Sequence, residues 1–196
     1  MAGSIVELAH SEKAGLIVMP THGYGRFRRF ILGSVTAKVL HDADCPVLTG
    51  AHIEQATPLE TVSFRSILCA IDFDAAGEKA FRWATELAAE FQARLTLLHA
   101  LPNIQFTEMN YYDESLPRLY REVAQQKSEE LQRLMGTASE VILETGSVAD
   151  VVRDAAMAKK SDLVVIGRHA SAGLLGRLRT HAYAIVRESP CPVVSV

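Results

Sequence analysis

The sequence has few cysteines, no long apolar run and little net charge, and each shortage excludes a class of protein. Three widely spaced cysteines in 196 residues do not suit a disulfide-stabilised secreted framework. The 20 basic and 23 acidic residues give a net charge of −3, which argues against nucleic-acid binding and against an anionic membrane surface as a partner. The apolar runs have the length of strands and are too short to cross a bilayer. With no secretion signal at the N-terminus, we expect a cytoplasmic protein.

The three cysteines, Cys45, Cys69 and Cys191, each border an apolar run. A disulfide or a reactive thiol is one interpretation. The other, which we favour, is that all three are small buried apolar residues in a reducing compartment.

What the sequence does contain is a long internal repeat. A buried strand, a glycine-bearing loop, a helix and a Cys-Pro-Val strand occur near the N-terminus and again at the C-terminus. Val18 and Val165 occupy equivalent positions 147 residues apart, whereas Cys45 and Cys191 are 146 apart, so the second loop is one residue shorter. This spacing is too long for a solenoid repeat and indicates two copies of one domain.

The first copy is predicted to be only the second half of a domain, over residues 1–49. A helical segment at 5–14 ends near Gly15 and leads into a β-branched strand from Leu16 to Met19. The predicted helix at 34–42 and the short strand starting at Pro46 complete it. No strand-helix-strand portion precedes these elements, and residues 50–64, which lack periodicity and contain a proline, are predicted to be a linker.

The second copy, residues 65–196, is predicted to be a complete domain. Strands are expected at 66–71, 94–99, 141–144, from 163 and at the C-terminus, with helices at 75–92, 115–135, 147–160 and from 180. This alternation predicts an α/β fold with an open, doubly wound, parallel five-stranded sheet. Ligands of such sheets bind beyond the carboxyl ends of the strands. Asp72, the loop after His99 and the loop 167–180 should therefore lie on one rim.

The repeated module resembles the universal stress protein family. The hallmark of that family is a glycine, two residues, a second glycine, nine residues and then Gly-Ser or Gly-Thr, followed by a helix and a Cys-Pro-Val strand. The first copy matches at Gly23, Gly33 and Ser34 but has Pro20 in place of the first glycine. The resemblance implies the adenine-nucleotide-binding type of α/β fold, and the order of the segments suggests a tandem protein.

The resemblance also implies a nucleotide site. Glycines let backbone amides approach phosphate oxygens, and the N-terminus of the following helix adds unpaired N–H groups. In ATP-binding members the carboxylate after strand one holds the nucleoside and backbone after strand two contacts the adenine. The residues at the matching positions, with ATP and accompanying Mg²⁺ as the implied ligand, are Gly23, Gly33, Ser34, Asp72, Ala100, Gly167 and Thr180.

Neither copy carries the whole pattern. The half-domain has no strand one and hence no acidic residue of its own. The complete domain keeps Gly167 and Thr180 but has Ala170 for the second glycine and Arg179 for the third. An arginine at a close-approach position obstructs a triphosphate unless its guanidinium pairs with phosphate. We therefore expect a degenerate nucleotide site, and a composite site between two subunits remains an alternative.

Other candidate chemistries are weaker. Arginines flank both loops, as phosphate ligands or as a solvated basic rim; they are Arg26, Arg28, Arg29, Arg168, Arg177 and Arg179. The seven histidines lack the spacing of a metal site, and no metal is predicted. Asp72 and Asp74 resemble a catalytic pair, but no nucleophile accompanies them, so ligand contact or loop capping is favoured.

Two functions follow. The first is a non-enzymatic stress-response protein acting through self-association and regulatory interactions; the alternative is an ATP-binding regulator with slow hydrolysis. Members of the family pair their last strands across a dimer, which implies self-association through the terminal strands. Here we predict that the last strand of the half-domain pairs with that of the complete domain within one chain. The uncovered sheet of the half-domain should then drive further oligomerisation.

Overall fold

The first copy folds as two helices and two strands. The computed structural model describes residues 1–21, 32–50, 62–103, 115–168 and 177–196, with backbone alone at 177–180. The elements of the first copy are α1 (Ala2–Ser11), β1 (Ile17–Pro20), α2 (Ser34–Asp42) and β2 (Val47–Gly50). The helix α1 begins three residues before the predicted segment, because Ala2 also packs into the core below it.

The second copy has the predicted alternation of strands and helices. Its elements are β3 (Ser66–Ala70), α3 (Ala75–Phe91), β4 (Arg94–Leu101), α4 (Ser115–Met135), β5 (Glu140–Thr145), α5 (Val148–Lys159), β6 (Leu163–Ile166), α6 (Arg177–Glu188) and β7 (Val193–Ser195). As predicted, Ser147 caps α5, since its hydroxyl accepts a hydrogen bond from the amide of Asp150. The helix α6 begins at Arg177, three residues before the predicted start at Thr180.

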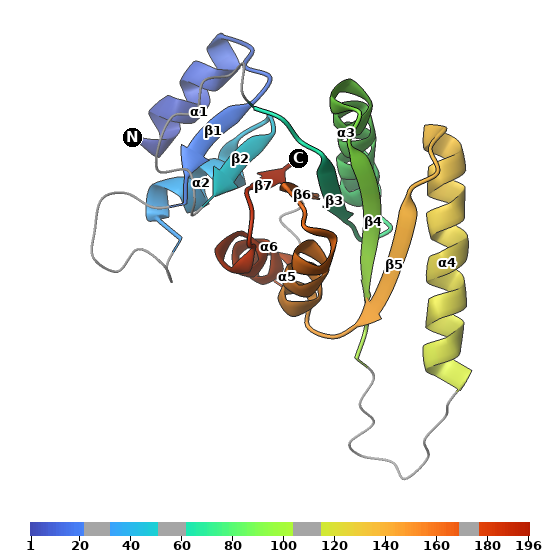
Figure 1. The fold of residues 1–196 in the computed structure, drawn as a ribbon. Helices are drawn as coiled ribbons and strands as arrows, with labels where there is room; N and C mark the ends of the chain where they lie inside the picture. Colours follow the sequence, from blue (N-terminus) through green and yellow to red (C-terminus); the bar gives the residue numbers. More distant parts are fainter. Residues whose placement is uncertain (22–31, 51–61, 104–114, 169–176) are drawn as a thin grey trace, which may run out of the picture.

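All described strands belong to one sheet with the order β1-β2-β7-β6-β3-β4-β5 (Figure 1). The five strands of the complete domain are parallel to one another, which confirms the predicted doubly wound sheet. The sheet has seven strands because β2 pairs with β7 in antiparallel orientation. The predicted pairing of the two terminal strands within one chain is therefore confirmed.

Apolar side chains on both faces of the sheet hold the helices in place. On one face Leu163 and Val165 of β6 pack with α3, and on the other Val164 and Ile166 pack with α5 and α6. This two-sided burial explains why the strand reads as a continuous apolar run. The half-domain has a smaller core of its own between α1, α2 and its two strands.

The two copies are related by an approximate two-fold axis. Leu48 and Val194 are equivalent residues 146 positions apart, and they are direct partners in the antiparallel ladder. Ala37 and Tyr183 are also equivalent, and the Tyr183 hydroxyl donates to the Ala37 carbonyl at 3.2 Å. Equivalent positions that contact each other must lie on the axis. The first copy therefore packs against the second across this approximate axis. Among the described helices, none is long and apolar enough to span a membrane.

Candidate functional site

The complete domain has its topological switch point between β3 and β6. The chain leaves β3 toward β4 on one side, whereas β6 pairs with β3 on the other side. Ala70 and Ile166 are partners at the ends of these two parallel strands, so Asp72 and Gly167 follow at the same edge of the sheet. Ala100 lies near the end of the neighbouring strand β4, where it pairs with Glu144. The structure thus brings together Asp72, Ala100 and Gly167, as predicted.

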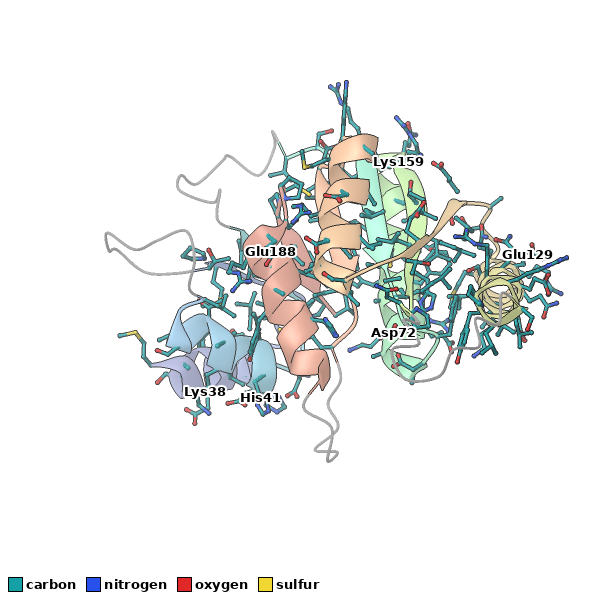
Figure 2. The ribbon with its side chains drawn as sticks, turned by 90° about the horizontal axis from the view of Figure 1, so that it is seen from below. Lys38, His41, Asp72, Glu129, Lys159 and Glu188 are labelled. Atoms are coloured by element: carbon teal, nitrogen blue, oxygen red, sulfur yellow. The ribbon has the colours of Figure 1, made fainter. Side chains whose placement is uncertain are left out.

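Asp72 presents an accessible carboxylate at this edge. Its side chain is 54% exposed, and its Oδ1 lies 3.8 Å from Nδ1 of His99. The same ring nitrogen lies 2.9 Å from the Ile71 carbonyl oxygen. Because a carbonyl can only accept, Nδ1 carries the hydrogen and donates it to Ile71. Figure 2 shows Asp72 apart from the half-domain helix that carries Lys38 and His41.

The imidazole of His99 also has an aromatic neighbour. The Phe73 ring lies 4.5 Å from it, and Nζ of Lys127 lies 5.7 Å from the Phe73 centroid. His99 was not among the residues predicted to contact a ligand, although Asp72 and the backbone at Ala100 were. His99 ends a predicted strand and immediately precedes Ala100. This position in the sequence could have indicated that His99 lies beside the Asp72 carboxylate.

The first turn of α3 packs tightly against the backbone of Asp72. Asp74 is the N-cap of α3 and accepts a hydrogen bond from the amide of Gly77 at 2.8 Å, so of the two favoured interpretations, ligand contact or capping, Asp74 has the capping role. A Cβ on Gly77 would lie 1.8 Å from the Asp72 carbonyl oxygen. A Cβ on Gly167 would lie 2.7 Å from the carbonyl oxygen of Ala76. Packing of the β6 end against α3 therefore already requires glycine at position 167, without any ligand.

The predicted residues of the half-domain that the structure describes lie at the opposite ends of the strands from Asp72. The N–H of Gly33 donates to the Thr21 carbonyl at 2.9 Å, which places the start of α2 at the carboxyl end of β1. Ser34 is exposed there, in the first turn of the helix. Because β2 and β7 are antiparallel, the carboxyl ends of β1 and β3 point in opposite directions. Gly33 and Ser34 are therefore not brought together with Asp72.

The remaining predicted positions are only partly described. Gly23 lies outside the described residues, and Thr180 is described only as backbone within α6. Asp72, Ala100 and Gly167 are therefore the members of the predicted set that share one edge in the described part of the chain.

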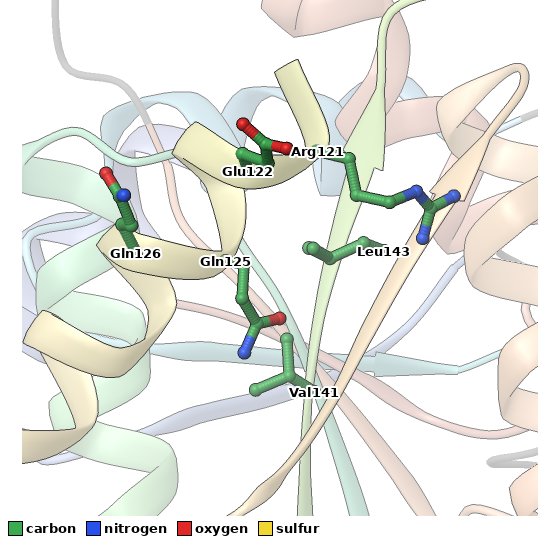
Figure 3. A pocket seen from close by; sticks show the side chains of 6 residues that line it. All are labelled: Arg121, Glu122, Gln125, Gln126, Val141 and Leu143. Atoms are coloured by element: carbon green, nitrogen blue, oxygen red, sulfur yellow. The ribbon is translucent and has the colours of Figure 1, made fainter. Parts of the chain in front are cut away.

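A separate open cavity of about 440 Å³ lies between α4 and the edge strand β5 (Figure 3). It contains none of the predicted site residues, and polar α4 side chains surround an apolar floor. Its lining consists of Arg121, Glu122, Gln125, Gln126, Val141 and Leu143.

Comparison with known proteins agrees with the resemblance found in the sequence. The model of the universal stress protein family matches residues 1–49 and 63–196. A universal stress protein of Mycobacterium bovis is 27% identical over 195 residues, which cover 94% of this chain and 62% of the relative. One of Thermus aquaticus is 28% identical over 136 residues, which cover 68% of this chain and 98% of the relative.

Two solved structures share the fold. A functionally unknown protein of Pseudomonas aeruginosa has a TM-score of 0.72 at 23% identity over 100% of this chain and 67% of its own. A universal stress protein of Archaeoglobus fulgidus has a TM-score of 0.65 at 21% identity over 99% of this chain and 64% of its own. This chain thus spans about two thirds of these two structures and 62% of the mycobacterial relative. Taken with the sheet order and the repeated module, the family match shows that the chain belongs to the universal stress protein family.

Proposed function

We propose that this chain is a non-enzymatic stress-response protein that acts by self-association, with the open edge of β1 as its association surface. The observation that carries the proposal is the exposure of Val18, a residue that is 56% exposed within an edge strand of the described sheet. Residues 1–49 serve as the back half of a first domain, residues 50–64 as a linker and residues 65–196 as the complete domain.

The complete domain shows what covers an edge of this kind. Val165, equivalent to Val18, is fully buried between β6 and α3. Ala155 of α5 is 8% exposed, whereas the equivalent Leu8 of α1 is 61% exposed. The clusters that bury Val165 and Ala155 include residues of β3, α3 and β4 from the front half of the domain, and no described element takes their place beside β1. The apolar residues Val18 of β1 and Leu8 of α1 are thus both left in contact with water, which favours association.

The backbone of β1 favours the same conclusion. The Ile17 amide donates to the Pro46 carbonyl on the β2 side at 2.9 Å. Because successive residues of a strand direct their hydrogen-bonding groups to opposite sides, the N–H and C=O of Val18 face the side of β1 on which no described strand pairs. A free pair of this kind is a template for another strand. The strands β2 and β7 were predicted to mediate assembly. Each already pairs with a neighbouring strand on both sides within the chain.

Sedimentation velocity of the full chain tests this proposal. We expect a dimer or larger oligomer at micromolar concentration, and Val18→Lys should weaken association at least about tenfold by placing a charge in an apolar contact. Val123→Lys is the matched control, because Val123 is 41% exposed on α4, away from β1. A monomeric wild-type chain at these concentrations would contradict the proposal.

ATP binding at the edge that carries Asp72 is the second candidate. The exposed carboxylate lies at the switch point beside Ala100 and Gly167, where ligands of open α/β sheets bind. With ATP and Mg²⁺, calorimetric titration of protein freed of copurified nucleotide should show saturable binding that Asp72→Ala abolishes and Asp154→Ala leaves unchanged. Loss on Gly33→Val alone would instead assign binding to the half-domain loop. Absence of any binding would leave association as the sole function proposed.

A further inference from the structure

Arg168 lies at the junction between the two copies. Its Nη1 donates to the Leu40 carbonyl at 3.1 Å, and its Nη2 donates to the Cys45 carbonyl at 2.6 Å. Its backbone amide donates to the carbonyl of Val196 at 2.9 Å. One residue of the complete domain is therefore bonded both to its own last strand and, through its side chain, to the half-domain.

The acceptors suit a guanidinium group. Leu40 lies in the last turn of α2, where carbonyl groups lack helical partners and carry the negative end of the helix dipole. The planar fork of an arginine reaches two carbonyls at once, whereas a lysine ammonium acts as a point charge. Burial lowers the pKa of the Arg168 guanidinium. Its Nε is also buried and has no hydrogen-bond partner among the residues that the structure describes.

The two-fold relation between the copies does not extend to this contact. The position equivalent to Arg168 in the first copy is Thr21, 147 residues earlier. Under the two-fold relation its acceptors would be the carbonyls of Val186 and Cys191, the equivalents of Leu40 and Cys45. A threonine side chain is too short to make this bridge. The arginine clamp is therefore present on one side of the axis only.

We propose that Arg168 is the positioning residue that fixes the half-domain, and with it the open β1 edge, against the complete domain. The position follows the first glycine of the second loop, where the sequence also allows a phosphate ligand. In the structure its two terminal nitrogens donate to the half-domain instead. Gly167 lies against the Ala76 carbonyl of α3, and the next residue, Arg168, bonds to the half-domain. The position of the half-domain and the strand ends that carry Asp72 are therefore linked through two consecutive residues.

Hydrogen exchange followed by mass spectrometry on the full chain tests the proposal. In Arg168→Met, exchange of the amides at 39–50 should accelerate at least about tenfold, because two charge-assisted hydrogen bonds are lost. Exchange in β4 and β5 should not change. Arg168→Lys keeps the charge without the fork and should give an intermediate acceleration, which also provides the measurement if the methionine variant does not fold. Cys45→Ala is the control and should match wild type, because the acceptor is the backbone carbonyl.

Two results would overturn the proposal. The first is wild-type exchange at 39–50 in both arginine variants. The second is an equal acceleration throughout the chain, which would indicate a general loss of stability instead of a specific release of the half-domain.

Discussion

Replacing Gly77 with alanine should destabilise the complete domain by about 3 kcal/mol, the upper end of the usual cost of overpacking. The new Cβ would lie 1.8 Å from the Asp72 carbonyl oxygen and 3.1 Å from the Ile71 Cβ. Backbone cannot move aside as the end of a flexible side chain can, so the start of α3 must shift away from the sheet. The same shift would displace Asp72 from the edge where the candidate nucleotide site lies.

Urea denaturation measures this effect. With a typical dependence of stability on denaturant, the midpoint should fall by about 1.5 M. Gly15→Ala is the matched control, because no described atom beyond the glycine and its two chain neighbours lies within 4 Å of the Cβ it would add. We expect that control to change stability by no more than about 0.5 kcal/mol. A Gly77→Ala midpoint equal to that of the control would show that the packing of α3 on Asp72 is not as close as described.

Cys69 should be alkylated about a thousandfold more slowly than Cys45 in the folded protein. Cys69 lies within β3 with no exposed surface, and burial raises the pKa of its thiol far above the ordinary value. The thiolate is the reactive form, so reaction must await opening of the sheet. Cys45 is partly accessible beside the half-domain strand.

Iodoacetamide labelling with peptide mapping distinguishes the three thiols. Burial also raises the pKa of Cys191, which is partly accessible, so its rate should fall between those of the other two. In guanidinium chloride above the unfolding midpoint all three rates should converge. Rapid labelling of Cys69 in the native protein would mean that β3 opens easily, contrary to its central place in the sheet. All three cysteines are free in the structure. The favoured interpretation that all three are buried is correct for Cys69 and wrong for Cys45 and Cys191, which are partly accessible.

The sequence could predict the fold because its signals are local or repeated. Strand β6 reads as an apolar run because both its faces are buried, and α3 shows helical spacing because one of its faces packs on the sheet. The equivalence of Cys45 and Cys191 indicated two copies of one module, and the two apolar terminal strands indicated their pairing. Each of these patterns reports the immediate surroundings of a residue, which its neighbours in the chain largely determine.

The sequence predicted that Asp72, Ala100 and Gly167 share one rim, but it could not place the half-domain residues relative to them. That placement depends on the direction in which distant strands pair. The antiparallel contact of β2 with β7 places Gly33 and Ser34 at the edge opposite Asp72. Likewise, the requirement for glycine at position 167 comes from a carbonyl in α3, some 90 residues earlier in the chain. Arg168 has a loop position typical of a phosphate ligand, yet its donors reach the carbonyls of Leu40 and Cys45. The sequence by itself therefore determined the elements, the repeat and the family. Only the tertiary structure decided which of these residues contact one another, because hydrogen bonds and close packing depend on distances in space and not on separation along the chain.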